Sequence, residues 1–406
     1  MRLVRRPKLR RGEGIRSVDP SETLARFEPL LGAAGMGPLE DLTGMDSTGI
    51  PVYAVHRDET AKGTWGNYNG KGHTPEQAMA SAVMEAMERY SSEVRETDEI
   101  IYGTVAEAEA HGPTVRPGSL ILPVATAHLA DVAELAWARG YDIIRGEEVW
   151  VPACAIFHPY YPDGDLQLFR YNTNGLASGN DLEEAILHAL FEVVERDAWS
   201  IAEYRGVPAP DVTVAEGTPA HDLVGRFADA GVEIRLKDIT SDVGIPTIAA
   251  ASDDVRTRDP EMLAIGVGTH LDPQIAAVRA LTEVAQSRST HKHGVKVNAR
   301  LRDATRELGY DRVKGLNRVW YGDGPRTVPL AGIEDRSTDY VMDDLEIALG
   351  ALVGAGLTRA AVVDLTREDV GVPTVRVVVP GMEVYAMDSE RMGNRLYLQP
   401  DSDITY

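Results

Sequence analysis

Four short stretches of the chain share one pattern, in which a proline near the start is followed by β-branched or small apolar residues. This pattern favours strands entered through a proline, because proline cannot donate to a neighbouring strand and β-branched side chains suit a pleated surface. The stretches lie at 49–55, 150–156, 244–250 and 371–379. After each of the first three, a loop containing Gly or Asn leads into apolar residues at helical spacing. The sequence therefore predicts three strand–loop–helix units.

The start of each predicted helix carries a good capping residue. Thr74 precedes a proline and stands three residues before Gln77, which is the spacing of a capping box. The second helix has Asn180 or Asp181 as its cap. The third has Asp272, which is again followed by a proline. We expect the three helices to begin at these residues.

Each of these mostly apolar helices presents a narrow polar stripe. The segments SAVMEAMER at 81–89 and HALFEVVER at 188–196 both fit x-A-x-x-E-x-x-E-R. At about 100° per residue, the polar side chains of each helix fall within an arc of about 60° to 80°. They are Ser81, Glu85 and Glu88 in the first helix, Glu184, His188, Glu192 and Glu195 in the second, and Arg279, Glu283 and Gln286 in the third.

Carboxylates inside such apolar helices need a positive partner, because burying an unpaired charge costs several kcal/mol. One explanation is a structural network with Arg89, Arg196 and Arg279. Repetition on three helices favours the other explanation, in which the glutamates converge on hard divalent cations. Ligands rich in carboxylate and poor in His and Cys point to Mg²⁺, which commonly bridges to substrate phosphates. The glycine-containing loops before the helices add N–H groups suited to an anion.

Composition narrows the class of protein. The 406 residues include 43% hydrophobic ones, and the formal net charge of −22 disfavours binding to nucleic acid or anionic lipid. We find no apolar run of about 18 residues, so we expect no membrane span, and the basic start of the chain has no apolar stretch of a signal peptide. The single cysteine, Cys154, suggests a reducing compartment, and we expect a cytoplasmic protein.

Three segments together resemble the YcaO superfamily, whose members use ATP to activate a backbone amide of a peptide or protein. They are NGKGHTPEQAMASAVMEAMERYS at 69–91, NTNGLASGNDLEEAILHALFEVVERDAWS at 172–200 and RALTEVAQSR at 279–288. The second is most similar to the methanogen branch, which is associated with installing a thioglycine in methyl-coenzyme M reductase. The resemblance runs from about Gly14 to about Tyr385.

The resemblance implies an α+β fold, with mixed or antiparallel sheets, flanking helices and three strand–loop–helix units around one nucleotide site. We expect a basic flexible tail at 1–13, a catalytic domain at 14–386 and a C-terminal tail at 387–406. That tail lacks the PxPxP ending of azoline-forming relatives, which favours the branch that does not form rings. A homodimer is common in the family.

Carried over by position, the resemblance assigns ATP and Mg²⁺ to particular side chains. Arg16 stands where the family has lysine, and Thr23 where it has serine, so both swaps keep the charge or the hydroxyl. The metal ligands would be Glu85, Glu88, Glu192 and Glu195. The nucleotide would be bound by Arg16, Thr23, Ser81, Asn180, Glu184, Arg196, Gln286 and Arg288. No covalent nucleophile is expected, and the catalytic acid or base stays unassigned.

The activity implied is formation of a thioamide, with sulfide as the nucleophile and ATP accepting the amide oxygen. The substrate would be the α subunit of methyl-coenzyme M reductase, with a sulfide donor and a TfuA-like partner. Three alternatives stay open: an azoline-forming cyclodehydratase, a di-metal hydrolase that does not use ATP, and a non-catalytic docking protein.

Overall fold

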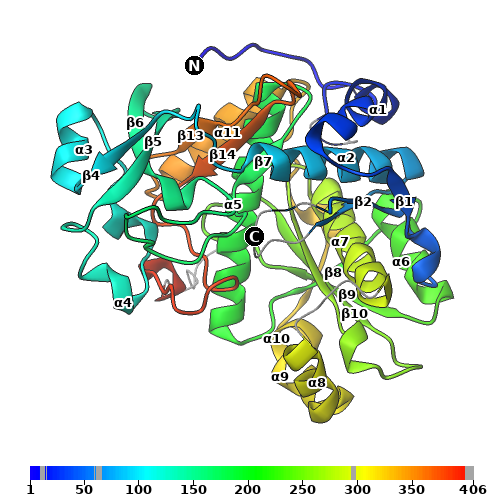
Figure 1. The fold of residues 1–406 in the computed structure, drawn as a ribbon. Helices are drawn as coiled ribbons and strands as arrows, with labels where there is room; N and C mark the ends of the chain where they lie inside the picture. The colour runs from blue at the N-terminus through cyan, green and yellow to red at the C-terminus, as the bar shows by residue number, and fades with distance from the viewer. Residues whose placement is uncertain (10–13, 15, 59, 61–65, 294–298, 398–406) are drawn as a thin grey trace.

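Fourteen strands form three sheets in the computed structural model, which describes residues 1–9, 14, 16–58, 60, 66–293 and 299–397 (Figure 1). The first sheet has the order β1-β2-β3, the second β11-β10-β9-β8-β12, and the third β4-β5-β13-β14-β7 with β6 paired to β5. Every pair is antiparallel except β8 with β12. The expected α+β fold with mixed sheets is confirmed.

The strands are β1 Leu39–Asp41, β2 Val52–His56, β3 Asn67–Lys71, β4 Ile100–Gly103, β5 Leu135–Asp142, β6 Glu147–Pro152, β7 Leu176–Ser178, β8 Asp211–Thr213, β9 Glu233–Asp238, β10 Thr247–Asp253, β11 Ile265–Thr269, β12 Thr327–Pro329, β13 Ala361–Asp364 and β14 Thr374–Val378. The α-helices are α1 Pro20–Phe27, α2 Pro75–Ser91, α3 Val105–His111, α4 Val124–Ala127, α5 Leu182–Arg205, α6 Pro219–Asp229, α7 Pro273–His293, α8 Ala299–Leu308, α9 Tyr310–Leu316, α10 Arg318–Tyr321 and α11 Val341–Gly354. No helix within these described ranges is long and apolar enough to cross a bilayer.

Three proline-entered strands, β2, β10 and β14, have the same partner arrangement. Each pairs antiparallel with the strand that leads directly into a striped helix: β3 into α2, β11 into α7, and β7 into α5. The residue after each proline faces the last residue of its partner strand, as Val52 with Lys71, Thr247 with Thr269, and Thr374 with Ser178. The segments expected as plain loops therefore contain strands.

The stretch at 150–156 differs from our prediction. Strand β6 ends at Pro152, and Ala153–Ala155 forms a short 3₁₀ helix. Proline here closes a strand instead of opening one. It can do so because β6 pairs with β5 outside the main strand order of the sheet, where a residue without an N–H interrupts no hydrogen bond between strands.

The predicted helix starts are confirmed. Thr74 Oγ1 accepts the N–H of Gln77, and Asp181, not Asn180, caps α5 by accepting the N–H of Glu184 at 2.9 Å. Asp272 Oδ1 accepts the N–H of Gln274 at 2.8 Å. In all three units the cap stands three residues after the strand ends, so the three helices leave their strands in the same way.

Glycine lets these helices lie directly on their strands. A Cβ at Gly70 would stand 2.1 Å from Ala78 O and from Ala82 N of α2. A Cβ at Gly268 would stand 2.2 Å from Ala276 O of α7. Real Cβ atoms do not approach backbone this closely, so both positions require glycine. The close packing fixes which face each helix turns away from its sheet.

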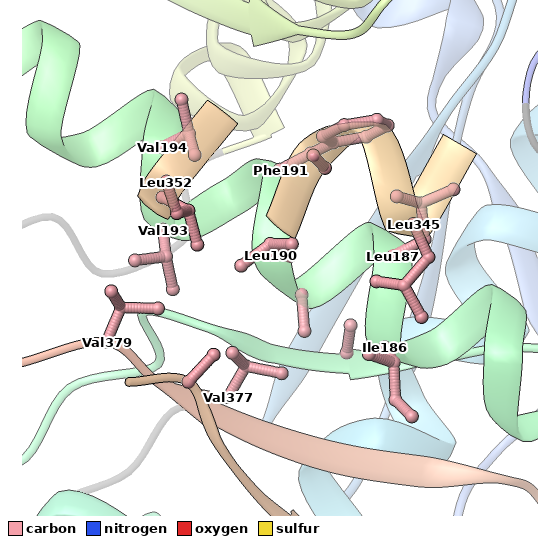
Figure 2. Packing of buried hydrophobic residues seen from close by; sticks show 14 of the residues in the cluster. Ile186, Leu187, Leu190, Phe191, Val193, Val194, Leu345, Leu352, Val377 and Val379 are labelled. Atoms are coloured by element: carbon pink, nitrogen blue, oxygen red, sulfur yellow. The ribbon is translucent and has the colours of Figure 1, made fainter. Parts of the chain in front are cut away.

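One of the two largest cores lies around α5, which is covered by β14 on one side and by α11 on another. Figure 2 shows Leu187, Leu190 and Phe191 of α5 near Leu345 and Leu352 of α11, with Val193 toward Val377 and Val379. Because α5 is buried along most of its length, its polar stripe occupies a fixed place in the interior.

Both predicted tails are held against the body of the protein where the structure describes them. Pro7 forms a bridge with Tyr340, and buried Lys8 pairs with Asp344 of α11. Near the other end, Arg395 pairs with Asp197 and Asp242. Residues 1–9 of the expected flexible tail therefore contact the body of the protein through ion pairs and a backbone bridge. Residues 10–13 and 398–406 lie outside the described residues.

A Cβ at Gly70 should separate β3 from α2. We expect Gly70→Ala to lower the free energy of unfolding by about 1–3 kcal/mol or more, as overpacking does. Gly350 of α11 is the matched control, since a Cβ there meets nothing within 4 Å. Gly350→Ala should be neutral or stabilise by up to about 1 kcal/mol. Chemical denaturation measures both, and equal effects would contradict the close-packing argument.

Candidate functional site

The polar stripes of α2, α5 and α7 meet at one cavity of about 370 Å³. Its volume is within the range of small-molecule sites. The cavity brings together nine of the twelve residues that the sequence assigned to metal or nucleotide. They are Arg16, Thr23, Ser81, Glu85, Glu88, Asn180, Glu192, Glu195 and Arg196.

The three helices contribute equivalent positions to this cavity. Counted from the caps Thr74, Asp181 and Asp272, the eleventh residue is Glu85, Glu192 and Glu283 in turn. The seventh is Ser81, His188 and Arg279. The fourteenth is Glu88, Glu195 and Gln286. Glu283 lines the cavity although it was left out of the assigned residues, and its spacing from the cap was the signal that could have identified it.

Arginines stand beside the carboxylates at distances longer than hydrogen bonds. Arg89 lies 3.6 Å from Glu85 and 3.4 Å from Glu88. Arg196 lies 3.6 Å from Glu195 and 3.9 Å from Glu283. Such pairs reduce the electrostatic cost of burial without satisfying the oxygens. The carboxylate oxygens therefore keep capacity for another positive partner.

The pKa values of two glutamates reflect this incomplete pairing. Burial raises the pKa of Glu88 to about 8, against the opposing effect of Arg89. Burial likewise raises the pKa of Glu195 to about 7, although Arg196 lowers it. Glu195 Oε2 and Arg89 Nη1 are buried without a hydrogen-bond partner. Unsatisfied carboxylates with raised pKa values are the surroundings that a divalent cation would stabilise.

The glutamates lie along the cavity wall and are not gathered at one point. Within the parts of the chain that the structure describes, no three His, Cys, Asp or Glu side chains are close enough to hold a metal ion. Mutual repulsion of carboxylates in a poorly solvated cavity opposes their convergence. The donor set is nevertheless all oxygen, which suits Mg²⁺ better than Zn²⁺.

One end of the cavity is built around Glu184, which lies behind the wall and is 0% exposed. Glu184 accepts hydrogen bonds from Arg16 and from Asn180 Nδ2, the latter at 3.1 Å. Asn180 Oδ1 in turn accepts from Thr23 Oγ1 at 2.9 Å. Glu184 was expected to contact the nucleotide; in the structure it contacts Arg16 and Asn180, which line the cavity.

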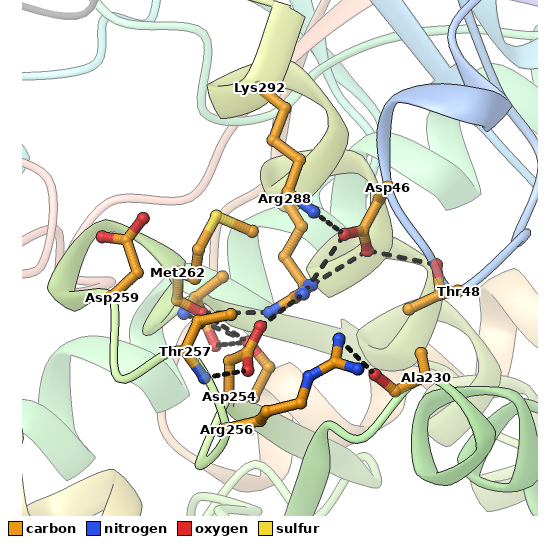
Figure 3. A network of polar contacts seen from close by, with 12 residues as sticks. Asp46, Thr48, Ala230, Asp254, Arg256, Thr257, Asp259, Met262, Arg288 and Lys292 are labelled. Atoms are coloured by element: carbon orange, nitrogen blue, oxygen red, sulfur yellow. Dashed lines mark hydrogen bonds and ion pairs between the residues drawn. The ribbon is translucent and has the colours of Figure 1, made fainter.

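Two further assigned residues, Gln286 and Arg288, do not line the cavity. Gln286 Nε2 donates to Asn69 O of β3 at 2.7 Å. Arg288 is 0% exposed and donates to both carboxylate oxygens of Asp46, at 2.9 and 3.2 Å (Figure 3). The helix continues to His293, so Arg288 leaves α7 on another face than Glu283.

Lys71, His188 and Arg279 also line the cavity but were not in the assigned set. Lys71 ends β3, and its Nζ lies 3.3 Å from Glu283. His188 Nε2 lies 3.3 Å from both Nη atoms of Arg279. Burial and the Arg279 charge hold the pKa of His188 well below its usual value, so the neutral imidazole accepts from the guanidinium. Arg279 Nε and His188 Nδ1 have no hydrogen-bond partner, which leaves polar capacity for a ligand.

Comparison with known proteins agrees with this geometry. The family model described as YcaO cyclodehydratase, ATP- and Mg²⁺-binding, matches residues 69–383. An uncharacterized protein of Methanothermobacter thermautotrophicus is 47% identical over 384 residues, covering 94% of this chain and 98% of the relative. An uncharacterized protein in the tfuA 3′ region of Rhizobium leguminosarum bv. trifolii is 32% identical over 386 residues, covering 91% of this chain and 89% of that one.

Solved structures give the same picture. YcaO from Methanopyrus kandleri bound with AMPPCP and Mg²⁺ has a TM-score of 0.80 and 31% identity, covering 97% of this chain and 98% of that chain. A heterocyclase in complex with substrate and cofactor has a TM-score of 0.79 and 26% identity, covering 94% of this chain and 54% of that chain.

Arg196 and Arg288 should separate ligand binding from stability. We expect Arg196→Met to weaken binding of Mg²⁺ with AMPPCP at least about tenfold, because a charge facing the cavity is lost. Arg288→Met should lower the free energy of unfolding by about 3–5 kcal/mol, since it leaves Asp46 buried and less well paired. Its folded fraction should bind the nucleotide within about twofold of wild type. Calorimetry and denaturation test this, and a tenfold loss of binding in Arg288→Met would show that Arg288 takes part in nucleotide binding.

Affinity for Mg²⁺ should depend on pH. Glu88 and Glu195, with pKa values of about 8 and about 7, keep their protons at pH 6 and release them as the pH rises. A cation needs the deprotonated oxygens, so the affinity for Mg²⁺ with AMPPCP should rise more than about tenfold from pH 6 to pH 8. Calorimetry in buffers of different ionisation enthalpy should also detect proton release on binding. An affinity independent of pH would mean that these two carboxylates are not ligands.

Proposed function

This chain belongs to the YcaO family, and on that premise we propose that it converts a backbone amide of a peptide or protein into a thioamide, with sulfide as the nucleophile. ATP and Mg²⁺ are its cofactors, as the family model and the neighbour with AMPPCP and Mg²⁺ indicate. The likeness to heterocyclase supports a peptide as the second substrate. We propose residues 14–386 as the catalytic domain.

The observation that carries the proposal is a cavity rich in carboxylates and cations, in a chain that offers no cysteine to it. The one cysteine, Cys154, is buried outside the cavity, and burial raises its pKa to about 12. A thiol that stays protonated cannot act as a nucleophile or carry sulfur. The sulfur must therefore come from outside the chain.

In this proposal the side chains position reactants and neutralise charge. Glu85, Glu88, Glu192 and Glu195 would hold Mg²⁺, which supplies positive charge for the phosphates. Lys71 and the cavity arginines Arg89, Arg196 and Arg279 would offset the remaining negative charge. Arg16, Thr23, Ser81 and Asn180 would hold the rest of the nucleotide. Gln286 and Arg288 hold the fold together and take no part.

The reaction balances without a redox partner. Hydrosulfide adds to the carbonyl carbon, and the resulting oxyanion attacks the γ-phosphorus of ATP, releasing ADP. The carbon–oxygen bond then breaks, so that the amide oxygen leaves in phosphate and the carbon–sulfur double bond remains. The proton of hydrosulfide ends on the phosphate. The protein supplies orientation and electrostatic stabilisation, which is the usual contribution in phosphoryl transfer.

The relatives guide the choice of substrate and partner. Similarity to proteins of Methanothermobacter and Methanopyrus supports a glycine of the methyl-coenzyme M reductase α subunit as the first target to test. The relative named for the tfuA 3′ region supports a TfuA-like partner in delivering sulfide. We further propose that the protein is cytoplasmic, since a lone cysteine suits a reducing compartment. We also propose that it forms the homodimer that is common in the family.

Mass spectrometry of a glycine-containing peptide from that subunit tests the proposal. With ATP, Mg²⁺ and sulfide, wild type should replace one oxygen by sulfur at a single glycine. Glu192→Gln should slow this at least about 100-fold, because the metal loses a charged ligand. Glu203→Gln is the control on the same helix, where Glu203 is exposed and bonded to Trp199. Loss of water in place of sulfur gain would show azoline formation, and peptide cleavage without ATP would show a hydrolase.

A further inference from the structure

A second, smaller cavity of about 50 Å³ lies next to the carboxylate site. We call it the Arg376 cavity. Its wall includes Val193, which follows Glu192 along α5, and Asn174, which precedes Gly175. Gly175 N donates to Glu192 Oε1 at 3.2 Å, so the loop at 174–175 joins the wall of one cavity to a glutamate of the other. Arg376 also interacts electrostatically with Glu192 and Glu88.

Two arginines line the Arg376 cavity without a carboxylate partner. Arg376 is 4% exposed, and Arg391 is 5% exposed. Arg376 donates to the backbone and side-chain oxygens of Asn172, and Arg391 donates to two backbone carbonyls and stacks on Phe169 at 3.9 Å. Neither guanidinium forms an ion pair with any residue that the structure describes. Arg376 Nε has no hydrogen-bond partner at all.

This arrangement differs from that of two other buried arginines, Arg288 and Arg395. Arg288 is paired with Asp46 and Arg395 with Asp197, because a buried charge is costly unless an opposite charge and hydrogen bonds compensate it. Two neighbouring cations that line one small cavity and form no ion pair indicate a place for an anion. Burial lowers the pKa of both Arg376 and Arg391 to about 10, which leaves them charged at neutral pH.

The size and lining of the cavity limit which anion fits. A volume of about 50 Å³ admits a few atoms only. Much of the wall is apolar, including Phe169, Val193 and Met382, and suits a soft, polarisable atom better than a fully hydrated oxyanion. Asn174 Oδ1 is buried without a hydrogen-bond partner and can accept a hydrogen bond from the anion. Hydrosulfide has this combination of one negative charge, small size and one S–H donor.

We propose that the Arg376 cavity binds hydrosulfide, with the charge at the Arg376 guanidinium and the S–H toward Asn174, beside the carboxylate site where the amide is activated. This inference rests on the proposed function and assigns a place to its nucleophile. Arg376 acts as a binding residue for the nucleophile, and Arg391 supports the local positive potential.

Steady-state kinetics with sodium hydrosulfide test the assignment. Arg376→Met should raise the KM for sulfide at least about tenfold, while the KM for ATP stays within about twofold. Arg376→Lys should recover part of the loss, because it restores the charge. The matched control is Arg367→Met, which removes an arginine that is 7% exposed, bonds to Glu93 O and does not line the cavity. An unchanged sulfide KM in Arg376→Met, or an equal rise for ATP, overturns the proposal.

Crystals of the wild-type chain soaked in sodium bromide give a measurement that needs no variant and no turnover. Bromide resembles hydrosulfide in charge and softness, and its anomalous signal should appear beside Arg376 and be displaced by added hydrosulfide. A bromide-free cavity overturns the proposal even if thioamide forms. If wild type makes no thioamide, the proposed function fails. Bromide beside Arg376 would then still support the anion site by itself.

Discussion

The site depends on one constraint, which is that glutamates from three helices face one another inside a poorly solvated cavity. Like charges in such surroundings repel, and each carboxylate is costly to bury. Their positions are nonetheless fixed, because α2 and α7 lie on strands whose glycines allow backbone contact, and α5 is enclosed by a sheet and α11. The helices cannot rotate the charges away without breaking their cores. A cation that binds in the cavity would offset part of this cost, so the arrangement of the glutamates favours cation binding.

The distances between arginines and carboxylates differ between the cavity and the rest of the fold. Arg288 and Arg395 form hydrogen-bonded ion pairs with Asp46 and Asp197 at 2.8 to 3.2 Å, and these pairs hold loops and termini in place. Arg89 and Arg196 stand 3.4 to 3.9 Å from the cavity glutamates. A short pair satisfies both partners, whereas a long pair lowers the potential and leaves the oxygens open to another ligand. Arg89 and Arg196 thus belong to the second kind, and Arg288 and Arg395 to the first.

Sequence patterns predicted the parts of this structure that local chemistry dictates. The caps Thr74 and Asp272 set two of the helix starts, and the polar stripes identified most of the cavity. Strands β3 and β11 were missed because their glycines and asparagines lower strand propensity, and β7 was missed because it has only three residues. Pairing with another strand explains all three. The docking of Lys8 and the burial of Arg288 likewise depend on partners, Asp344 and Asp46, that lie far away in the chain. Long-range pairing of this kind leaves no periodic signal.

The third unit differs from the other two, and this difference gives the two sides of the cavity different charge. Where the first two units place Glu88 and Glu195, the third has Gln286, which donates to Asn69 O and so joins α7 to β3 of the first unit. Where they place Ser81 and His188, the third has Arg279. One equivalent position thus loses a negative charge and another gains a positive one. A symmetric ring of three identical units would repel phosphate at every side. Replacing carboxylate by amide, and a neutral side chain by guanidinium, makes one side suited to metal ions and the other to the phosphates that those ions accompany.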